Sequence, residues 1–313
     1  MRPRGGPALA AISTVSVQTS EPPRLRPVAR VRELARDREI LGNLVRKEVK
    51  VKYKSSVLGA AWSMLNPILY LAVFSLVFTV VLPNHTPHFP IYLLSGLLAW
   101  NLFATSLGLG ARSVVDNANL VTKVYFPREI LPFASIGAAG VDFLLQGLVL
   151  ILFMGAFRYN FVGLNVWLLP LSMVALLAFT AALTLWVASL NVRYRDTQHL
   201  LNLALLTWFW VTPIVYPSSL AYTQLAKHAA FWKYLYLANP MTDIVLGFQR
   251  ALYREVGPAV QLKGKIVHVA VLAPVSVGWL GILLGAVTVG SLLLLFLAWR
   301  TFFNLSGDFA EEL

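Results

Sequence analysis

The sequence predicts an all-α polytopic membrane protein with six transmembrane helices. Of the 313 residues, 58% are hydrophobic and only 13% are charged, whereas soluble domains are nearer to half apolar and a quarter charged. Six stretches of at least 23 residues lack Lys and Arg and, apart from Asp142, lack acids. Each is long enough for the roughly 20 helical residues that a bilayer core requires. The predicted spans are Ala60–Leu82, Phe89–Ala111, Ile130–Phe157, Tyr159–Val192, Thr197–Ala226 and Ile266–Trp299.

Two segments precede the first predicted span. Residues 1–29 are rich in Pro, Arg and Ser and are expected to form a disordered, basic cytosolic tail. Over residues 30–56, apolar side chains recur every three or four positions between basic ones. This pattern predicts an N-terminal amphipathic helix that lies along the membrane surface, the alternative being a solvated helix packed on a partner. Residues 1–59 hold 13 of the 26 Lys and Arg residues, which is typical of a cytosolic flank beside anionic headgroups.

The short loops give the orientation. With the N-terminus inside, the loop 112–129 and the turn 191–196 lie inside and carry five basic residues, whereas the short outer loops carry only Arg158. Both termini, including the tail 305–313, are then cytosolic. The segment 217–254 lies outside, and Asn239-Pro240 starts an amphipathic helix in it that is too short and too charged to span. We therefore expect extracytoplasmic re-entrant or interfacial helices there, within one transmembrane domain over residues 57–304.

Several kinds of chemistry are excluded or disfavoured. The chain has no cysteine, so disulfides and thiolate catalysis are excluded. It has no Walker A motif, so ATP-driven transport requires another polypeptide. The first outer loop, residues 83–88, lacks the acid that a glycosyltransferase requires, and His85 and His88 there are expected to form a polar turn rather than a metal site. The chain is therefore not expected to be an enzyme or to hold a metal or cofactor of its own.

Polar and aromatic residues inside the predicted spans are the remaining candidates for function, because polar groups are costly in lipid. Trp62, Asn66 and Tyr70 fall at i, i+4 and i+8, on one helix face. Aromatic rings with polar edges suit sugars, although Trp and Tyr also gather at bilayer interfaces without any such role. Asp142 is expected to pair with a neighbouring helix.

Five runs of residues resemble, in order, the ABC-2 type polysaccharide export permeases, which export O-antigen, teichoic acid and related lipid-linked glycans. The resemblance extends over residues 30–300, and within the family the likeness is nearest to exporters of galactan. The runs are Val51–Pro67, Asn117–Pro132, Asn191–Asp196, Thr212–Pro217 and Asn239–Val245.

The resemblance implies a homodimer in the plasma membrane that works with two copies of a separate ABC ATPase, the subunit that binds ATP and Mg. Residues 30–56 would be the interfacial gate helix, and the loop 112–129 would be the coupling helix that docks on the ATPase. A docked ATPase would cover Phe126-Pro127, which a plain basic turn would leave exposed. The implied coupling residues are Asn119, Leu120, Val121, Lys123, Val124, Tyr125, Phe126 and Arg128, with Arg193 and Arg195 as a second, smaller contact.

The resemblance also implies a substrate path. A polyprenyl-diphosphate glycan has an anionic headgroup, and the basic residues Arg46, Lys47, Lys50, Lys52 and Lys54 lie where it would bind. The glycan conduit would be lined by Trp62, Asn66, Tyr70, Trp208, Trp210 and Tyr216. Two alternatives stay open. A lipid- or drug-exporting ABC-2 permease shares the fold, and a membrane-embedded glycosyltransferase would have to use Asp243 or Glu255.

Overall fold

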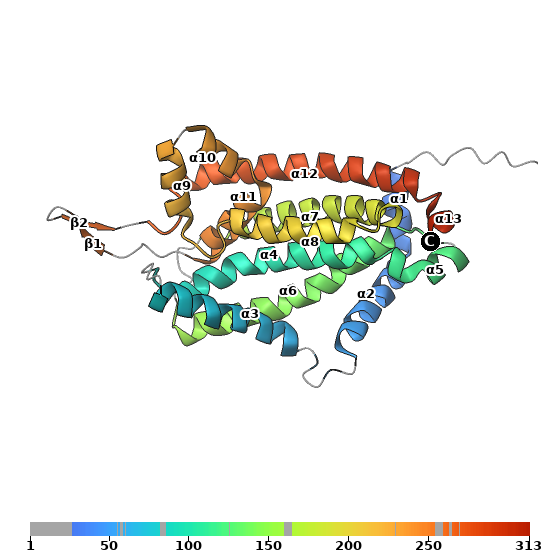
Figure 1. Ribbon diagram of the computed structural model, residues 1–313, viewed down its shortest axis with the longest axis horizontal. Coiled ribbons are helices and arrows are strands. Elements are labelled where there is room, and N and C mark those ends of the chain that lie inside the picture. The colour runs from blue at the N-terminus through green and yellow to red at the C-terminus, as the bar shows by residue number, and fades with distance from the viewer. Residues whose placement is uncertain are drawn as a thin grey trace, which may run out of the picture.

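The computed structural model is a bundle of helices with one short β-hairpin, which confirms the predicted all-α class (Figure 1). Helices α1, α5 and α13 lie at one end of the bundle, and α9, α10 and the hairpin lie at the other (Figure 1). We call these the α5 end and the hairpin end. The structure describes residues 27–54, 56, 59, 61–81, 86–124, 126–159, 165–228, 230–253, 259–262, 265–268 and 270–313.

The long elements of the bundle are α3 (Ala61–Ser75), which continues as π-helical turns over Leu76–Val81, α4 (Phe89–Arg112), α6 (Ile130–Ala156), α7 (Leu168–Arg193), α8 (Thr197–Val211) and α12 (Val277–Leu305). The α5 end holds α1 (Pro27–Arg36), α2 (Arg38–Tyr53), a 3₁₀ turn over Val115–Asn117, α5 (Ala118–Lys123) and α13 (Phe309–Glu312). The hairpin end holds α9 (Ser218–His228), α10 (Ala230–Leu237), α11 (Pro240–Leu252), β1 (Ala259–Leu262) and β2 (Lys265–His268).

Among the described residues, five helices are long and apolar enough to cross a membrane. They are Ala61–Phe78, Phe89–Arg112, Ile130–Ala156, Leu168–Arg193 and Val277–Leu305. Each contains much of one predicted span, so the chain is a polytopic membrane protein. The fourth and sixth begin later than the sequence suggested, at Leu168 and Val277. The first three residues of the sixth predicted span, Ile266 to His268, belong to strand β2 of the hairpin instead.

The fifth predicted span, Thr197–Ala226, is not a single helix in the structure. Helix α8 ends at Val211 after 15 residues, and α9 starts only at Ser218. The break contains Pro213 and Pro217, and a proline removes a backbone donor and clashes with the preceding turn. An α-helix of this length spans about 22 Å, less than the roughly 30 Å of a hydrocarbon core. The predicted count of six spans is therefore not confirmed.

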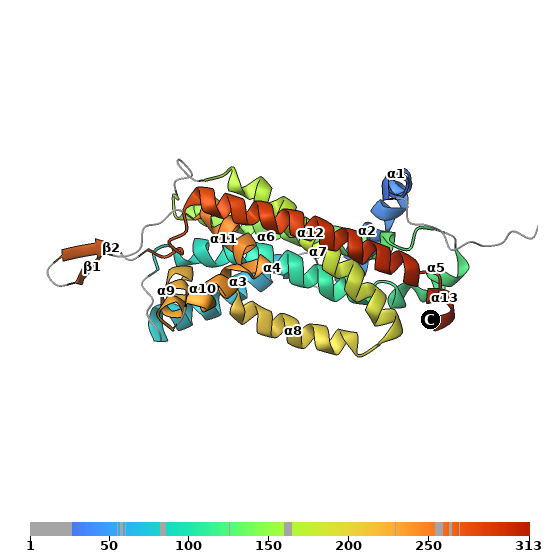
Figure 2. The ribbon, with the colours of Figure 1, turned by 90° about the horizontal axis from the view of Figure 1, so that it is seen from above.

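Helices α4 and α7 form the centre of the bundle, with α6 packed on α4 and α12 packed on α7. Figure 2 shows α8 along one side, where it contacts α4 and α7. The predicted amphipathic helix after Asn239-Pro240 exists as α11, and the Asn239 side chain caps it by accepting from Met241 N. Its apolar residues are buried against α4, α7 and α12. Large apolar side chains stay exposed on α3, α6, α8 and α12, as expected for faces that meet lipid.

A glycine allows a close contact between the two central helices. Gly110 of α4 is buried, and a Cβ added there would overlap the Cγ2 methyl of Thr184 on α7. Gly108 lies on the same helix, and nothing stands within 4 Å of its Cβ position.

We expect Gly110→Ala to lower the free energy of unfolding by about 1–3 kcal/mol, because overpacking forces a tight core apart. Gly108→Ala is the matched control and should be neutral or slightly stabilising, because Ala favours helix. Thermal unfolding of the detergent-solubilised protein measures both. In a Thr184→Ser background, which removes the obstructing methyl, Gly110→Ala should cost much less. Equal unfolding midpoints for the two alanine variants would show that the contact does not limit packing.

Candidate functional site

The α5 end is built around α6, which carries two buried carboxylates. Glu129 is the N-cap residue of α6, and its side chain is 1% exposed. Asp142 lies thirteen residues further along, about 20 Å up the helix at 1.5 Å per residue, and its side chain is 8% exposed. Burying a carboxylate is costly unless it is paired and hydrogen-bonded. Both carboxylates take their cation from the N-terminal helices, Glu129 from α1 and Asp142 from α2.

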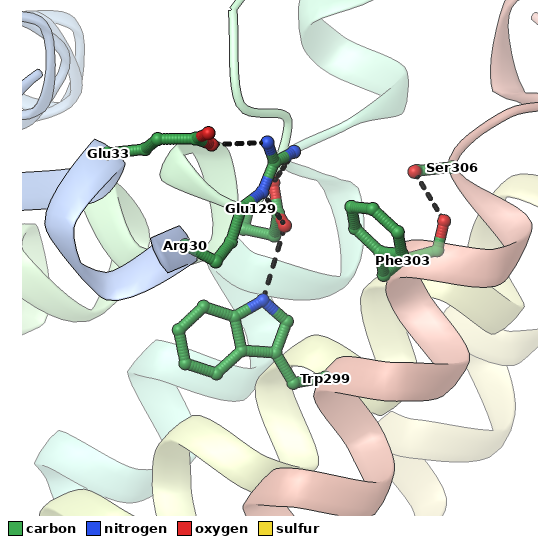
Figure 3. A network of polar contacts seen from close by, with 6 residues as sticks. All are labelled: Arg30, Glu33, Glu129, Trp299, Phe303 and Ser306. Atoms are coloured by element: carbon green, nitrogen blue, oxygen red, sulfur yellow. Dashed lines mark hydrogen bonds and ion pairs between the residues drawn. The ribbon is translucent and has the colours of Figure 1, made fainter. Parts of the chain in front are cut away.

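Glu129 joins three segments that are far apart in the sequence. Arg30 of α1 donates to it through Nε at 3.0 Å, and Trp299 of α12 donates through Nε1 at 3.2 Å (Figure 3). The guanidinium of Arg30 also pairs with Glu33 and lies over the ring of Phe303. Partial burial opposes the charge of Arg30, but its hydrogen bonds and charge contacts with Glu129 and Glu33 outweigh burial and raise its pKa.

Asp142 is the centre of a second polar cluster, made with Lys52, Tyr53 and Ser63. Lys52 Nζ lies 2.5 Å from Oδ2, and Oδ1 accepts from Tyr53 OH at 2.9 Å and from Ser63 Oγ at 2.7 Å. Tyr53 and Ser63 also bond to each other. Burial raises the pKa of the Tyr53 hydroxyl, so this group remains a donor. The cluster joins the last turn of α2 and the first turn of α3 to the middle of α6, and the prediction that Asp142 pairs with neighbouring helices is confirmed.

Helix α2 therefore packs on α6, and two further contacts hold it in this position. Lys47 Nζ donates to Asn117 Oδ1 in the 3₁₀ turn before α5. Val45 packs closely on Gly137 of α6. A Cβ added to Gly137 would lie 2.6 Å from the Cγ2 atom of Val45. Figure 1 shows α2 running obliquely away from the α5 end.

The predicted headgroup-binding residues separate into two groups. Arg46, Lys47, Lys50 and Lys54 fall on one face of α2 and line a groove with a volume of about 650 Å³, together with Asn43 and Val51. We call it the basic groove. Lys52 is not part of the basic groove, because its side chain points to Asp142.

The predicted coupling residues lie at the α5 end. Asn119, Lys123 and Val124 are exposed, Leu120 and Arg128 are half-buried, and Val121 is buried. The second predicted contact is near, because α13 packs on both α5 and α7 and Arg193 pairs with Glu312 of α13 at 3.4 Å. Arg195 is exposed beside it. Tyr125 lies outside the described residues.

The expectation that Phe126 and Pro127 are exposed is wrong. Phe126 is 8% exposed and Pro127 is buried. Phe126 belongs to a second apolar core at the α5 end, which includes Leu44 of α2 and Ile130 of α6. The chain itself covers this ring, so no partner is required to do so.

The predicted conduit residues do not share one environment. Trp62, Asn66 and Tyr70 are all exposed along α3, and the buried Ser63, Pro67 and Leu71 lie on the adjacent face. Trp210 is exposed on α8. Trp208 is half-buried, donates to Asn239 Oδ1 at 2.8 Å and packs against Phe103 and Phe179, so it helps to hold the cap of α11. Tyr216 is half-buried and donates to the carbonyls of Trp210 and Val211.

Asp243, one of the two acids considered for glycosyl transfer, does not reach a surface. It lies on α11 and is 1% exposed. Burial raises the pKa of its carboxyl to about 8. The other acid, Glu255, lies outside the described residues.

Comparison with known proteins decides the family. Residues 41–253 match the family described as ABC-2 type transporter. The chain belongs to this family. Among its relatives, the O-antigen export system permease protein RfbA of Myxococcus xanthus is 38% identical over 226 residues, which are 72% of this chain and 84% of the relative. Two proteins of the same name from Klebsiella pneumoniae are 29% and 28% identical and cover 67% and 64% of this chain and 79% and 80% of their own length.

Sequence reasoning missed several polar contacts of this ABC-2 chain. It did not single out Arg30, Glu129 or Trp299, nor the parts of Tyr53 and Ser63 around Asp142. The position of Glu129, an acid directly before a long apolar stretch, is a signal that could have identified it. For Tyr53 and Ser63 no signal exists in the sequence, because their partner is about 80 or 90 residues away.

We expect Glu129→Gln to lower the free energy of unfolding of the ABC-2 chain by about 1.5–3 kcal/mol, because it weakens charged hydrogen bonds at a buried site. Glu33→Gln is the matched control. Its side chain is 52% exposed, so its pair with Arg30 should contribute less than about 1 kcal/mol. Chemical unfolding in detergent compares the two. Equal losses would mean that burial of Glu129 does not strengthen the contact.

Proposed function

We propose that the chain is the permease subunit of an ABC exporter that moves a lipid-linked polysaccharide from the cytosolic to the outer face of the plasma membrane. ATP hydrolysis in a separate ABC ATPase drives the movement, and the permease acts as a homodimer with two copies of that ATPase. The names of the relatives concern O-antigen export. The observation that carries the proposal for this chain is the basic groove of α2. A diphosphate-linked lipid has an anionic headgroup, and basic residues near a membrane surface attract such groups.

The orientation follows from the same argument. We place the α5 end in the cytosol, where the exposed parts of α5 and the turn with Arg193 and Arg195 would face the ATPase. Lys47 would pass a displacement of this region to α2, since it bonds to Asn117 directly before α5. The elements α9, α10 and α11 would close the outer exit.

The alternatives are distinguished by what the chain presents to a substrate. A membrane glycosyltransferase is disfavoured, because Asp243 is buried within the bundle. An ABC-2 permease for a lipid or a drug shares the fold, and the exposed stripe of Trp62, Asn66 and Tyr70 favours a sugar chain over it. Galactan is the glycan that we propose within this class.

Docking of the ATPase is tested at two exposed positions, with Lys123→Glu and Val124→Asp combined in one variant. We expect at least about tenfold less ATPase to co-purify from native membranes, because a reversed charge and a buried carboxylate each oppose association. Phe126 is unsuitable for this test, since it lies in the core.

Lys227→Glu on α9, at the hairpin end, is the matched control and should leave recovery of the ATPase unchanged. If the α5 variant and the control recover the same amount of ATPase as the unmodified chain, the docking surface lies elsewhere.

Headgroup binding is tested by Arg46→Gln, Lys50→Gln and Lys54→Gln together. Each basic residue near the surface contributes about 1 kcal/mol of attraction, so the triple variant should bind a polyprenyl diphosphate roughly 100-fold more weakly. Binding is measured with the permease–ATPase complex in neutral-lipid nanodiscs.

The control replaces Arg32, Arg36 and Arg38 with Gln, which removes the same charge from α1 and the start of α2, outside the basic groove. It should bind nearly as tightly as the unmodified chain. Equal weakening by both triple variants would assign the attraction to overall charge rather than to the groove.

A further inference from the structure

Helix α5 is too short to keep its position without support from other elements. It has six residues, Ala118–Lys123, whereas isolated helices shorter than about 12–15 residues are marginal in water. Asn119, Thr122 and Lys123 are exposed, and the buried side chain of α5 is that of Val121. The position of α5 therefore depends on the elements that pack beside it.

The helix on which α5 packs most extensively is α13. The two lie beside each other at the α5 end, and α13 also packs on α7 (Figure 1). A cleft with a volume of about 860 Å³ lies between the turn after α5, α1 and the turn that links α12 to α13. Because this space is open, α1 gives α5 little support from that side. Helix α13 is thus the main support of α5.

Phe309 anchors α13 in the bundle. Its side chain is 1% exposed and packs edge-to-face on Phe302 of α12, with the ring centroids 5.3 Å apart. Both rings belong to the apolar core of the α5 end, which also contains Val121 of α5 and Val192 of α7. One side chain of α13 therefore lies in the same core as residues of α5, α7 and α12.

An ion pair holds α13 to α7 as well. Nε of Arg193, in the last turn of α7, lies 3.4 Å from Oε1 of Glu312. The two side chains are 50% and 29% exposed, so solvent screens the pair and it contributes less than the buried ring. Arg193 thus has a partner within the chain, on the helix that supports α5.

We propose that α13 fixes α5 to the ends of α7 and α12, so that a displacement of α5 moves these two long helices. We call Phe309 with the Arg193–Glu312 pair the α5 support. Coupling between distant sites is carried by packed side chains and rigid elements, and α7 and α12 pack along each other through the bundle. Phe309 and Arg193 are positioning residues, because they act through α5. The inference rests on the proposed function, since it takes a docked ATPase as the source of the displacement.

The first measurement is the order of α5. The chain has no cysteine, so Thr122→Cys gives a unique spin-label site on the exposed part of α5. Spectra are recorded on the full chain in phosphatidylcholine nanodiscs without the ATPase, so that no docked partner orders α5. The label should be more mobile in Phe309→Ala than in the otherwise unmodified chain, because α5 then lacks its support. Phe309→Leu keeps much of the apolar volume and should restore most of the order.

The second measurement is the glycan exported per ATP hydrolysed by the permease–ATPase complex in membrane vesicles. Phe309→Ala should lower this ratio by at least about fivefold, the lower end of typical couplings between distant sites. Phe89→Ala is the matched control, because it removes a ring that is 3% exposed at the end of α4 remote from α5. It should lower the unfolding midpoint to a similar degree, yet leave both the label on α5 and the ratio unchanged.

The ion pair is tested by variants that leave the apolar core intact. Glu312→Lys places two cations together and should raise the mobility of the label on α5. Arg193→Glu in this background restores a pair of opposite charges and should restore the order of α5. A residue that acts only by touching the ATPase would not give this rescue, because the ATPase is absent.

Three results would overturn the inference. The first is a label on α5 that is equally mobile with and without the ring of Phe309. The second is an equal fall in glycan exported per ATP for Phe309→Ala and Phe89→Ala. The third is an exchanged ion pair in which α5 stays as mobile as in Glu312→Lys. The label is read without the ATPase, so the α5 support is tested independently of export. The proposed function fails separately, if the unmodified complex exports no glycan.

Discussion

Two carboxylates that α6 buries determine how the N-terminal third of the described chain is arranged. Burying the side chains of Glu129 and Asp142 is costly unless each has a cation and hydrogen-bond donors beside it, and no Lys or Arg lies within the span from Ile130 to Ala156. The cations come instead from Arg30 and Lys52, at the two ends of the N-terminal helices. The need to neutralise α6 therefore holds α1 and α2 against the bundle. It also places the basic groove on the outward face of α2, since the inward face is taken by Val45 and Leu44.

The two ion pairs, one from α1 and one from α2, differ in how far they are enclosed. Arg30 pairs with a carboxylate that is almost fully enclosed and is bonded to Trp299 as well, so its loss leaves several groups unpaired (Figure 3). The side chain of Lys52 is 42% exposed, although that of its partner Asp142 is only 8% exposed, so this pair is less enclosed than the pair of Arg30 and Glu129. Between them, Lys47 links the middle of α2 to the turn before α5. A single helix thus connects the surface proposed for the ATPase with the surface proposed for the headgroup.

The sequence was informative wherever a feature depends on near neighbours. Charge-free stretches predicted the regions of all five long apolar helices, and Asn239-Pro240 predicted the start of α11, because a cap and a first-turn proline act locally. It failed where the partner is distant. Phe126 is buried in an apolar core to which α2 and α6 both contribute, and Lys52, which the sequence groups with the surface cations, pairs with Asp142. The short α8 is a different case. Pro213 and Pro217 interrupt the helix, although the stretch from 197 to 226 has no charged residue and so resembles a span.

The aromatic residues show why composition alone overestimates a conduit. Trp208 lies two residues from Trp210 in the sequence, yet its indole N–H donates to Asn239, the cap of α11, and its ring makes edge-to-face contacts with Phe103 and Phe179. Asn66 is the more informative residue, because it is exposed on α3 between Trp62 and Tyr70. An amide in contact with hydrocarbon would have no hydrogen-bond partner. A face that carries an amide between two amphipathic rings therefore suits a second copy of the chain or a hydrated sugar better than lipid. This argument favours α3 as the wall of the path, and it limits the contribution of α8 to the exposed Trp210.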